Sequence, residues 1–332
     1  MPPRLTVVLV SLLLTSPVVI FWLWLVILPA RVAKLCPEKC RCDPGGYNVK
    51  CDGTSLNRVP LIHLTSVRDI DLKENNITFL ERDSFVLLTE MQNLHLWRCG
   101  LRTIKMGAFK GLTKLTRLSI GGNEISEIKP GTFENVMSLE ILYLDDNRIE
   151  HVNRDTFSGL FKVKYVSLSK NKLKYLHPDT FLRLPKLQEL HLTNNPGLKV
   201  PTDRNFIKSH SLLHLDISLC NISSVSVETF ANVSALEWLD LSNNNLKTLN
   251  ITILTTLPKL STLYLFFNPL HCDCQLQEVW RLCKDRNMWP GNHVRCNIPS
   301  EVNGIVWAVL DKGQCLQDNI QYNGGYKNYT DT

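Results

Sequence analysis

A pattern of leucine and asparagine recurs along most of this chain with a nearly constant period. It reads L-x-x-L-x-L-x-x-N-x-L, as in LEILYLDDNRI and, with valine for two of the leucines, VKYVSLSKNKL, and successive anchors are 24 residues apart except for one step of 25. The anchor residues are Asn75, Cys99, Asn123, Asn147, Asn171, Asn195, Cys220, Asn244 and Asn268. Nine registered copies predict a chain built from repeated units rather than from a single globular core.

Phenylalanines form a second ladder with the same spacing. Its members are Phe85, Phe109, Phe133, Phe157, Phe181, Phe206 and Phe230, with Leu254 in the eighth place. The one 25-residue step of this ladder falls in the same odd repeat, where NNPGLKV brings Leu198 one place late. Two ladders that share one irregularity indicate a single structural period.

The chemistry of one repeat follows from this spacing. Its leucines point inward from a short strand, and the residues between them point outward. One repeat cannot bury its apolar edge alone, so neighbouring repeats stack into a solenoid with a continuous core. The ladder asparagine pairs with backbone groups that would otherwise be buried without partners. Cys99 and Cys220 occupy the same slot, which favours a structural role over a redox or metal role for them.

Cysteines cluster at both ends of the repeats. CPEKCRCDPGGYNVKC precedes them, and NPLHCDC with three later cysteines follows them. Open solenoid ends need such covers. Together the repeats and the two cysteine groups resemble the leucine-rich repeat family, and more closely its extracellular members of the Slit, Toll and Nogo-receptor type. The resemblance implies an α/β fold, a curved solenoid with a parallel sheet on its concave face and disulfide-bonded caps.

The resemblance also implies how the cap cysteines pair. Sequence alone allows three connectivities for each set of four. The implied bridges are Cys36–Cys42, Cys40–Cys51, Cys272–Cys296 and Cys274–Cys315. Cys283 is left over, either as a buried free thiol or as an intermolecular bridge.

Five segments are expected. They are an export signal or signal anchor (1–33), an N-terminal cap (36–63), nine repeats of which the last merges into the cap (64–267), a C-terminal cap (268–316) and a polar tail (317–332). Residues 5–28 are almost wholly apolar, which suits a cleaved signal but is also long enough for a retained membrane anchor. The polar end suits either a secreted product or a fragment of a receptor ectodomain.

Paired cysteines predict an oxidising compartment, so we expect a secreted protein or one on the extracellular face of the plasma membrane. Five N-x-S/T sequences agree with this and are candidate glycosylation sites. They are at Asn76, Asn221, Asn232, Asn250 and Asn328.

Nothing in the sequence favours an enzyme, a metal site or a cofactor. G-x-S-x-G, H-E-x-x-H, P-loop and G-x-G-x-x-G sequences are all missing. The net charge of +6 on 332 residues is modest, and we expect no nucleic-acid partner. One basic concentration comprises Lys162, Lys164, Lys170, Lys172 and Lys174. It either binds a polyanionic glycosaminoglycan or is a solvated flank.

Function is therefore expected on the outward strand residues, where exposed aromatic side chains are typical binding anchors. The candidate partner-binding residues are Trp97, Ile141, Tyr143, Tyr165, His191, His214, Trp238, Tyr264 and Phe266. For Phe266, and for Phe267 beside it, the alternative is burial under the C-terminal cap. The strand register also places His191 near Asp216 and Glu189, which predicts a raised histidine pKa; the alternative is a solvated polar surface.

Two functions are compatible with this pattern. The first is a non-catalytic binding protein for another extracellular or cell-surface protein, in adhesion, guidance or immune recognition. The second is a structural matrix protein that binds collagen or glycosaminoglycan through its basic flank.

Overall fold

The computed structural model describes residues 35–288, 294–298, 300 and 303–306. The export segment, Cys315, Asn328 and the polar tail lie outside these residues, so the structure leaves those expectations as predictions. Among the described residues, no helix is both long and apolar enough to cross a bilayer.

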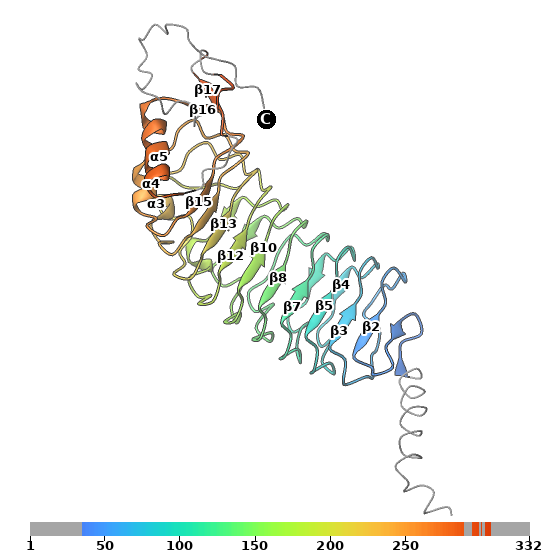
Figure 1. The fold of residues 1–332 in the computed structure, drawn as a ribbon. Coiled ribbons are helices and arrows are strands. Elements are labelled where there is room, and N and C mark those ends of the chain that lie inside the picture. Colours follow the sequence, from blue (N-terminus) through green and yellow to red (C-terminus); the bar gives the residue numbers. More distant parts are fainter. Residues whose placement is uncertain (1–34, 289–293, 299, 301–302, 307–332) are drawn as a thin grey trace, which may run out of the picture.

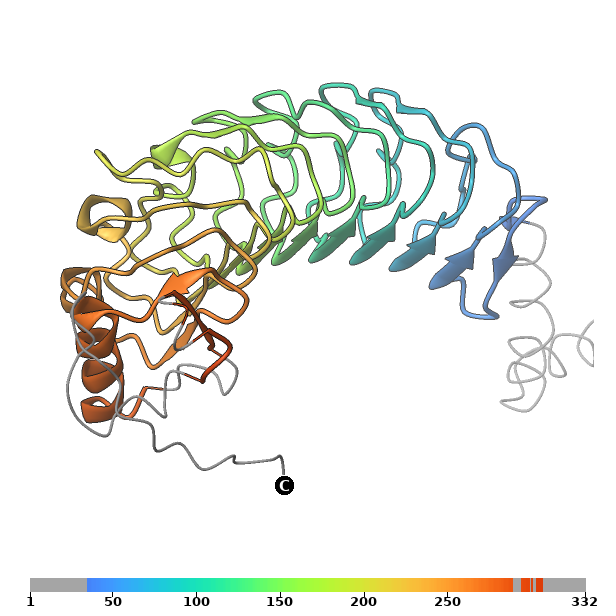
Figure 2. The same cartoon turned by 90° about the horizontal axis from the view of Figure 1, so that it is seen from above.

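The described residues form a curved solenoid with one long sheet along its inner side (Figures 1 and 2). The sheet has eleven strands within the described part of the chain, and all neighbours are parallel except the first pair. In spatial order the strands are β1 (Arg41–Cys42), β2 (Asn48–Lys50), β3 (Asp69–Asp71), β5 (Asn93–His95), β7 (Arg117–Ser119), β8 (Ile141–Tyr143), β10 (Tyr165–Ser167), β12 (Glu189–His191), β13 (His214–Asp216), β14 (Trp238–Asp240) and β15 (Thr262–Tyr264). The predicted parallel sheet is confirmed.

The outer side of the arc consists of loops, short strand pairs and short helices (Figure 2). The small parallel pairs are β4 (Phe79–Leu80) with β6 (Thr103–Ile104) and β9 (His151–Val152) with β11 (Tyr175–Leu176). The helical turns are η1 (Pro178–Thr180), α3 (Val227–Phe230) and α4 (Thr252–Thr255). The sheet therefore lines the concave side of the arc, and these outer elements lie on its convex side (Figure 2).

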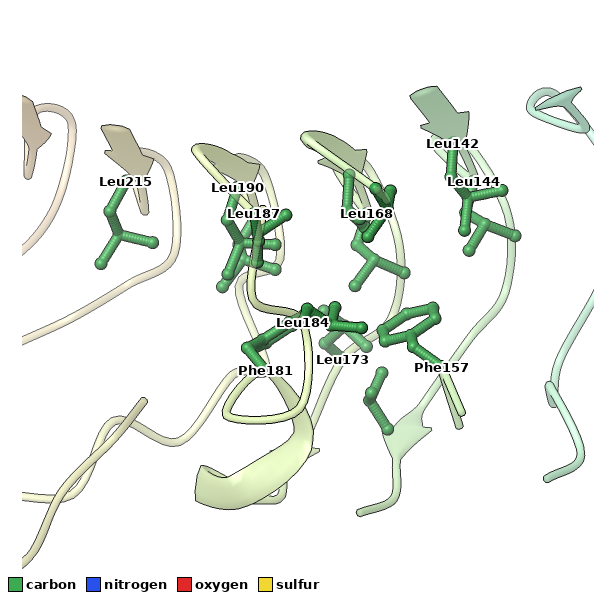
Figure 3. Packing of buried hydrophobic residues seen from close by; sticks show 14 of the residues in the cluster. Leu142, Leu144, Phe157, Leu168, Leu173, Phe181, Leu184, Leu187, Leu190 and Leu215 are labelled. Carbon is green, nitrogen blue, oxygen red and sulfur yellow. The ribbon is translucent and has the colours of Figure 1, made fainter. Parts of the chain in front are cut away.

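Leucines from the strands and phenylalanines from the outer turns meet between the two sides (Figure 3). Each three-residue strand of the repeats buries its middle residue, as Leu142 does in β8. The phenylalanine ladder is buried, and consecutive rings stack at centroid distances of 5.8 to 6.4 Å from Phe85 to Phe181. Both ladders predicted from the sequence thus lie in one continuous core.

The ladder asparagines connect successive repeats. Asn171 Nδ2 donates to the carbonyl oxygens of Leu144 (3.0 Å), one repeat back, and Leu168 (2.9 Å). Its Oδ1 accepts from the backbone nitrogen of Ile149 at 3.0 Å. Cys99 takes over part of this role, because its thiol donates to the carbonyl of Leu72 at 3.0 Å.

Each strand ends at a tight turn, where the residue before the ladder anchor has a positive φ. Lys170 (φ 53°) and Phe267 (φ 55°) are two examples. Side chains with a Cβ adopt this region at a cost, so the asparagine bonds on either side of the turn hold the backbone there. The turn limits each inner strand to three residues.

Both ends carry disulfides. Cys36–Cys42 and Cys40–Cys51 close the N-terminal cap, as the resemblance implied. β2 of this cap pairs in register with β3, and Val49 occupies a core position like the leucines of the repeats. The cap therefore extends the sheet instead of only covering its edge.

At the other end, β16 (Leu270–His271) pairs with β17 (Cys296–Ile298), and Cys272–Cys296 joins them. Helix α5 (Cys274–Asp285) is capped at its N-terminus by Asp273, whose carboxylate accepts from the backbone nitrogen of Leu276 at 3.0 Å. Cys274 is disulfide-bonded, while its expected partner Cys315 lies outside the described residues. Cys283 is a buried free thiol on α5.

Candidate binding surface on the concave sheet

The outward residues of the sheet form aligned columns on the concave face. The register pairs Ile141 with Tyr165 between β8 and β10, and His191 with Asp216 between β12 and β13. Each strand contributes two outward residues, and a third follows two places after the strand. These columns are the ones predicted from the repeat spacing.

Two tyrosines and a histidine form the first aromatic group. The ring centroids of Tyr143 and Tyr165 are 5.2 Å apart, and those of Tyr165 and His191 are 5.0 Å apart. Burial raises the pKa of the Tyr165 hydroxyl to about 12, so this ring stays neutral at physiological pH. Ile141 pairs with Tyr165 in the sheet register and adds apolar surface.

The second aromatic group lies on β13 to β15 and the turn after them. The ring centroids of His214 and Trp238 are 6.1 Å apart. Those of Trp238 and Tyr264 are 5.5 Å apart with the rings edge-on, and those of Tyr264 and Phe266 are 5.5 Å apart. Phe266 is half-buried against the core, whereas Phe267 is 70% exposed. The described part of the C-terminal cap thus leaves Phe267 at the surface.

Trp97 is placed by contacts that the sequence does not reveal. Its indole lies against the backbone of Gly121 in the next repeat. A Cβ on Gly121 would be 2.2 Å from Trp97 Cζ3 and 2.8 Å from the carbonyl oxygen of Asp145. The indole of Trp97 therefore packs directly on Gly121, and the backbone of Asp145 lies close to the same glycine. The doublet Gly121-Gly122 at an outward position was the available sequence signal.

His191 lies between two carboxylates, as the register predicted. Its Nδ1 is 3.7 Å from Asp216 and its Nε2 is 3.6 Å from Glu189. Burial lowers the pKa of His191, but the neighbouring carboxylates of Asp216 and Glu189 outweigh it, so the pKa is raised above 6.5. Burial raises the pKa of Asp216, but His191 and Ser218 more than offset it, and this pKa is lowered below 3.8.

Two further carboxylates of this face have raised pKa values. Burial raises the pKa of Asp145, with Lys170 acting weakly in the opposite direction. Burial and the neighbouring Asp216 raise the pKa of Asp240. Neither aspartate was among the predicted site residues, because a sequence does not show how deeply an outward residue lies.

The basic concentration is partly neutralised by acids from the preceding repeat. Lys164 Nζ is 2.7 Å from Glu140, and Lys174 Nζ is 2.6 Å from Glu150. Lys162 and Lys164 precede β10, while the other three lysines follow it. The five lysines therefore do not form one unpaired cluster, which weakens the glycosaminoglycan interpretation.

Four candidate glycosylation sites are exposed: Asn76, Asn221, Asn232 and Asn250. None of them lies in the concave columns. Glycans attached there would leave the inner face of the sheet accessible.

The three free thiols of the described residues are buried. Burial raises the pKa of Cys99 to about 11, and those of Cys220 and Cys283 to about 12, so these thiols stay protonated. Among the described residues, no cluster of His, Cys, Asp and Glu side chains is placed to hold a metal ion.

Comparison with known proteins agrees with this architecture. Residues 89–149, 137–196 and 210–270 match the family described as Leucine rich repeat, and together they cover just over half of the chain. Trophoblast glycoprotein of Macaca fascicularis is 29% identical over 134 residues, which are 40% of this chain and 32% of that protein. Toll-like receptor 9 of Mus musculus is 30% identical over 128 residues, 38% of this chain and 12% of that protein. The chain thus matches about a third and about an eighth of the length of these relatives.

Solved structures give a longer match. The crystal structure of human 5T4 (trophoblast glycoprotein) superposes with a TM-score of 0.59 at 25% identity, covering 82% of this chain and 96% of that one. A structure of a complex of Latrophilin 3, Unc5D and FLRT2, the last present as its leucine-rich repeats, superposes with a TM-score of 0.62 at 25% identity. The match covers 82% of this chain and 97% of that one. With the repeat match, the solenoid and the disulfides at its ends, these likenesses show that the chain belongs to the leucine-rich repeat family as an extracellular member with cysteine-rich caps.

Proposed function

We propose that this protein is a non-catalytic extracellular receptor or adhesion module that recognises another protein with the concave face of its solenoid. The observation that carries the proposal is the pair of half-exposed aromatic groups on β8 to β15. Tyr143 and Tyr165 form the first, and Trp238, Tyr264 and Phe266 form the second. Exposed tryptophan and tyrosine on a concave surface are the side chains that most often anchor a partner.

The dimensions of the surface support the proposal. Strands about 4.8 Å apart place β8 and β15 about 24 Å from each other, which is enough for a protein–protein interface of ordinary size. The FLRT2 repeats, which share this fold, are found in a complex with Latrophilin 3 and Unc5D. For this chain, adhesion, guidance and immune recognition are all compatible with the surface, and so is a place in the ectodomain of a membrane receptor.

The alternative is a matrix protein that binds collagen or glycosaminoglycan through Lys162–Lys174. Ion pairs with Glu140 and Glu150 leave that flank with less free charge, so the concave surface is favoured. Raising the salt concentration separates the two. Binding through the lysine flank falls steeply with salt, whereas binding anchored by aromatic side chains persists.

The direct test is to place a glycan on the concave face. Tyr165→Asn creates the acceptor sequence N-V-S at residues 165–167 on β10, while Met137→Thr creates N-V-T at residues 135–137 on the outer side. Full-length secreted protein with either substitution is screened against a panel of extracellular proteins. We expect Tyr165→Asn to abolish capture of the partner and Met137→Thr to retain it.

A third variant controls for the loss of the tyrosine. Tyr165→Gln removes the same side chain without creating an acceptor sequence, so it should weaken capture without abolishing it. If both glycosylated variants capture partners as the parent does, the binding surface lies elsewhere and the proposal is wrong.

A further inference from the structure

The concave positions from β8 to β15 carry an unusual set of charges. These are the two outward residues of β8, β10, β12, β13, β14 and β15, with the third residue that follows each strand. None of these positions holds a lysine or an arginine. Four of them hold carboxylates: Asp145, Glu189, Asp216 and Asp240. We call these positions, with their aromatic residues, the acidic strip. Its sign is opposite to the +6 of the whole chain.

On the flanks of the solenoid, several carboxylates pair with lysines one repeat away. Glu81 pairs with Lys105 at 2.6 Å and Glu90 with Lys114 at 2.6 Å on its flanks. On the concave face near the N-terminus, Asp71 pairs with Lys73 of the same repeat at 3.2 Å. In the acidic strip the ion pairs described are those of His191 with Glu189 and Asp216, and a histidine is only partly charged near neutral pH.

Two carboxylates of the strip are poorly compensated within the described structure. Asp145 has a buried Oδ1 that accepts no hydrogen bond. Asp240 accepts from the backbone nitrogen of Ser242 at 2.7 Å, and Asp216 stands beside it in the sheet register. Burial raises the pKa of both Asp145 and Asp240. Taking a carboxylate out of water without a counter-charge is costly, so a cation brought by a partner would stabilise this face.

Aromatic rings stand next to these carboxylates. Tyr143 precedes Asp145 on the same run of chain, and its ring meets that of Tyr165 at 5.2 Å. Tyr264 is the register partner of Asp240, and Trp238 stands on the same strand. Rings beside carboxylates suit a guanidinium or ammonium group, which gains a cation–π contact and an ion pair together. Lys170 lowers the pKa of Asp145, but it does not overcome the effect of burial.

We propose that the partner is an extracellular protein that presents arginine or lysine side chains to the acidic strip, with one cation near Asp145 and a second near Asp240. This inference rests on the proposed concave-face function and specifies the charge of the partner. It also means that the strip repels glycosaminoglycans, which are polyanions.

The test is a pair of matched double variants. Asp145→Asn with Asp240→Gln removes two charges from the strip. Gln is used at 240 because Asn would create the glycan acceptor sequence N-L-S at residues 240–242. Glu127→Gln with Glu228→Gln removes the same charge from exposed positions outside the strip. A short poly-arginine peptide is the probe, and its neutral citrulline counterpart is the control. Binding to the full chain is measured by calorimetry, and thermal unfolding of each variant confirms folding.

We expect the poly-arginine peptide to bind the parent and the Glu127/Glu228 variant equally, and the Asp145/Asp240 variant about tenfold more weakly. The citrulline peptide should bind none of them. Equal weakening in both double variants, or no binding of poly-arginine to the parent, would overturn the inference.

The outcome is separable from that of the proposed function. A partner that the Tyr165→Asn glycan blocks, but that binds the Asp145/Asp240 variant as tightly as the parent, contradicts the basic-partner inference and leaves concave recognition standing. A partner indifferent to the glycan contradicts the proposed function itself.

Discussion

At the scale of single residues, the asparagine ladder decides whether the repeats can stack. Each ladder asparagine donates to two carbonyls that lie in adjacent repeats and accepts from a third backbone group, as Asn147 does with Ile120, Leu144 and Ile125. Leucine can fill the same volume but can make none of these bonds. The ladder is therefore a hydrogen-bonding device that happens to sit in an apolar core.

We predict that Asn147→Leu or Asn171→Leu lowers the free energy of unfolding by about 1–3 kcal/mol, because buried backbone groups lose their partners. Asn171→Cys should cost less, since Cys99 shows that a thiol can bond a carbonyl from this slot. Chemical denaturation of the three variants measures the difference. Unchanged stability in both leucine variants would show that the ladder is not structural.

His191 provides a pH-dependent contribution at the same scale. Its pKa in the folded protein is raised above 6.5, so its stabilising effect is complete below about pH 6.5 and is lost as pH rises through the folded pKa. Asp216 has a lowered pKa, so its contribution is present above about pH 3.8 and is lost as pH falls through the folded pKa. The ion pair of His191 and Asp216 therefore stabilises the fold most between about pH 3.8 and about pH 6.5.

We therefore predict that His191→Gln destabilises the protein more at about pH 5.5 than at about pH 8.5, values chosen on either side of the ordinary histidine pKa. Thermal unfolding at both pH values measures the difference. His210→Gln, at an exposed position outside the columns, is the control. An equal loss at both pH values would separate His191 from its carboxylate neighbours.

At the scale of elements, the packing of Trp97 against Gly121, in the turn after β7, joins two repeats on the concave side. Gly121→Ala places a Cβ 2.2 Å from the indole and 2.8 Å from the carbonyl of Asp145, so both must move. We expect a loss of about 1–3 kcal/mol, measured by thermal unfolding. Gly197→Ala is the matched control, because its nearest atom is the carbonyl oxygen of Leu173 at 3.3 Å. Equal stability of the two variants would show that Trp97 is free to shift.

The C-terminal cap makes a second prediction at this scale. Cys272–Cys296 closes a loop with a sequence separation of 24 and holds β16 to β17. Cys272→Ser should cost about 3–4 kcal/mol and sharply reduce the secreted yield. Cys99→Ser and Cys220→Ser should still allow export, because both residues are free thiols in the ladder. Mass spectrometry that finds Cys99 or Cys220 in a native disulfide would contradict this assignment.

At the scale of the whole molecule, the solenoid separates its charges by face. The flanks carry lysines paired with acids one repeat away, and the outward positions of the inner face from β8 onward carry acids but no lysine or arginine. Curvature turns this acidic inner face toward whatever enters the arc (Figure 2). Net charge alone would have suggested an acidic partner.

The charge distribution predicts how binding responds to pH. Protonation of His191 reduces the negative charge of the strip, so affinity for a basic partner should fall from about pH 7.4 to about pH 5.5. Tyr165, Glu189 and Asp216 face His191. His191→Gln together with His214→Gln should abolish the change while folding remains intact. A double variant with the same pH profile as its parent would make these histidines ordinary surface residues.

Much of the architecture could be read from the sequence, because its determinants are local and repeated. A constant 24-residue step sets which residues are neighbours on adjacent strands, so the columns that hold Tyr143, Tyr165 and His191 follow from counting alone. The ladders follow for the same reason, since a leucine at the centre of every strand is buried only if it points into the shared core. The pairing of the cap cysteines followed only from resemblance, and the structure confirms three of the four pairs.

Other features were decided only by the tertiary structure. Repeat spacing does not say that Trp97 lies on Gly121, that one carboxylate oxygen of Asp145 is buried, or that Phe267 stays exposed beyond the last repeat. It also does not show that Glu140 and Glu150 neutralise two of the clustered lysines. These outcomes depend on side-chain rotamers and on the curvature that sets the distance between neighbouring turns. The period of the sequence determined which residues meet, and the three-dimensional packing determined how deeply each one lies and which charges remain for a partner.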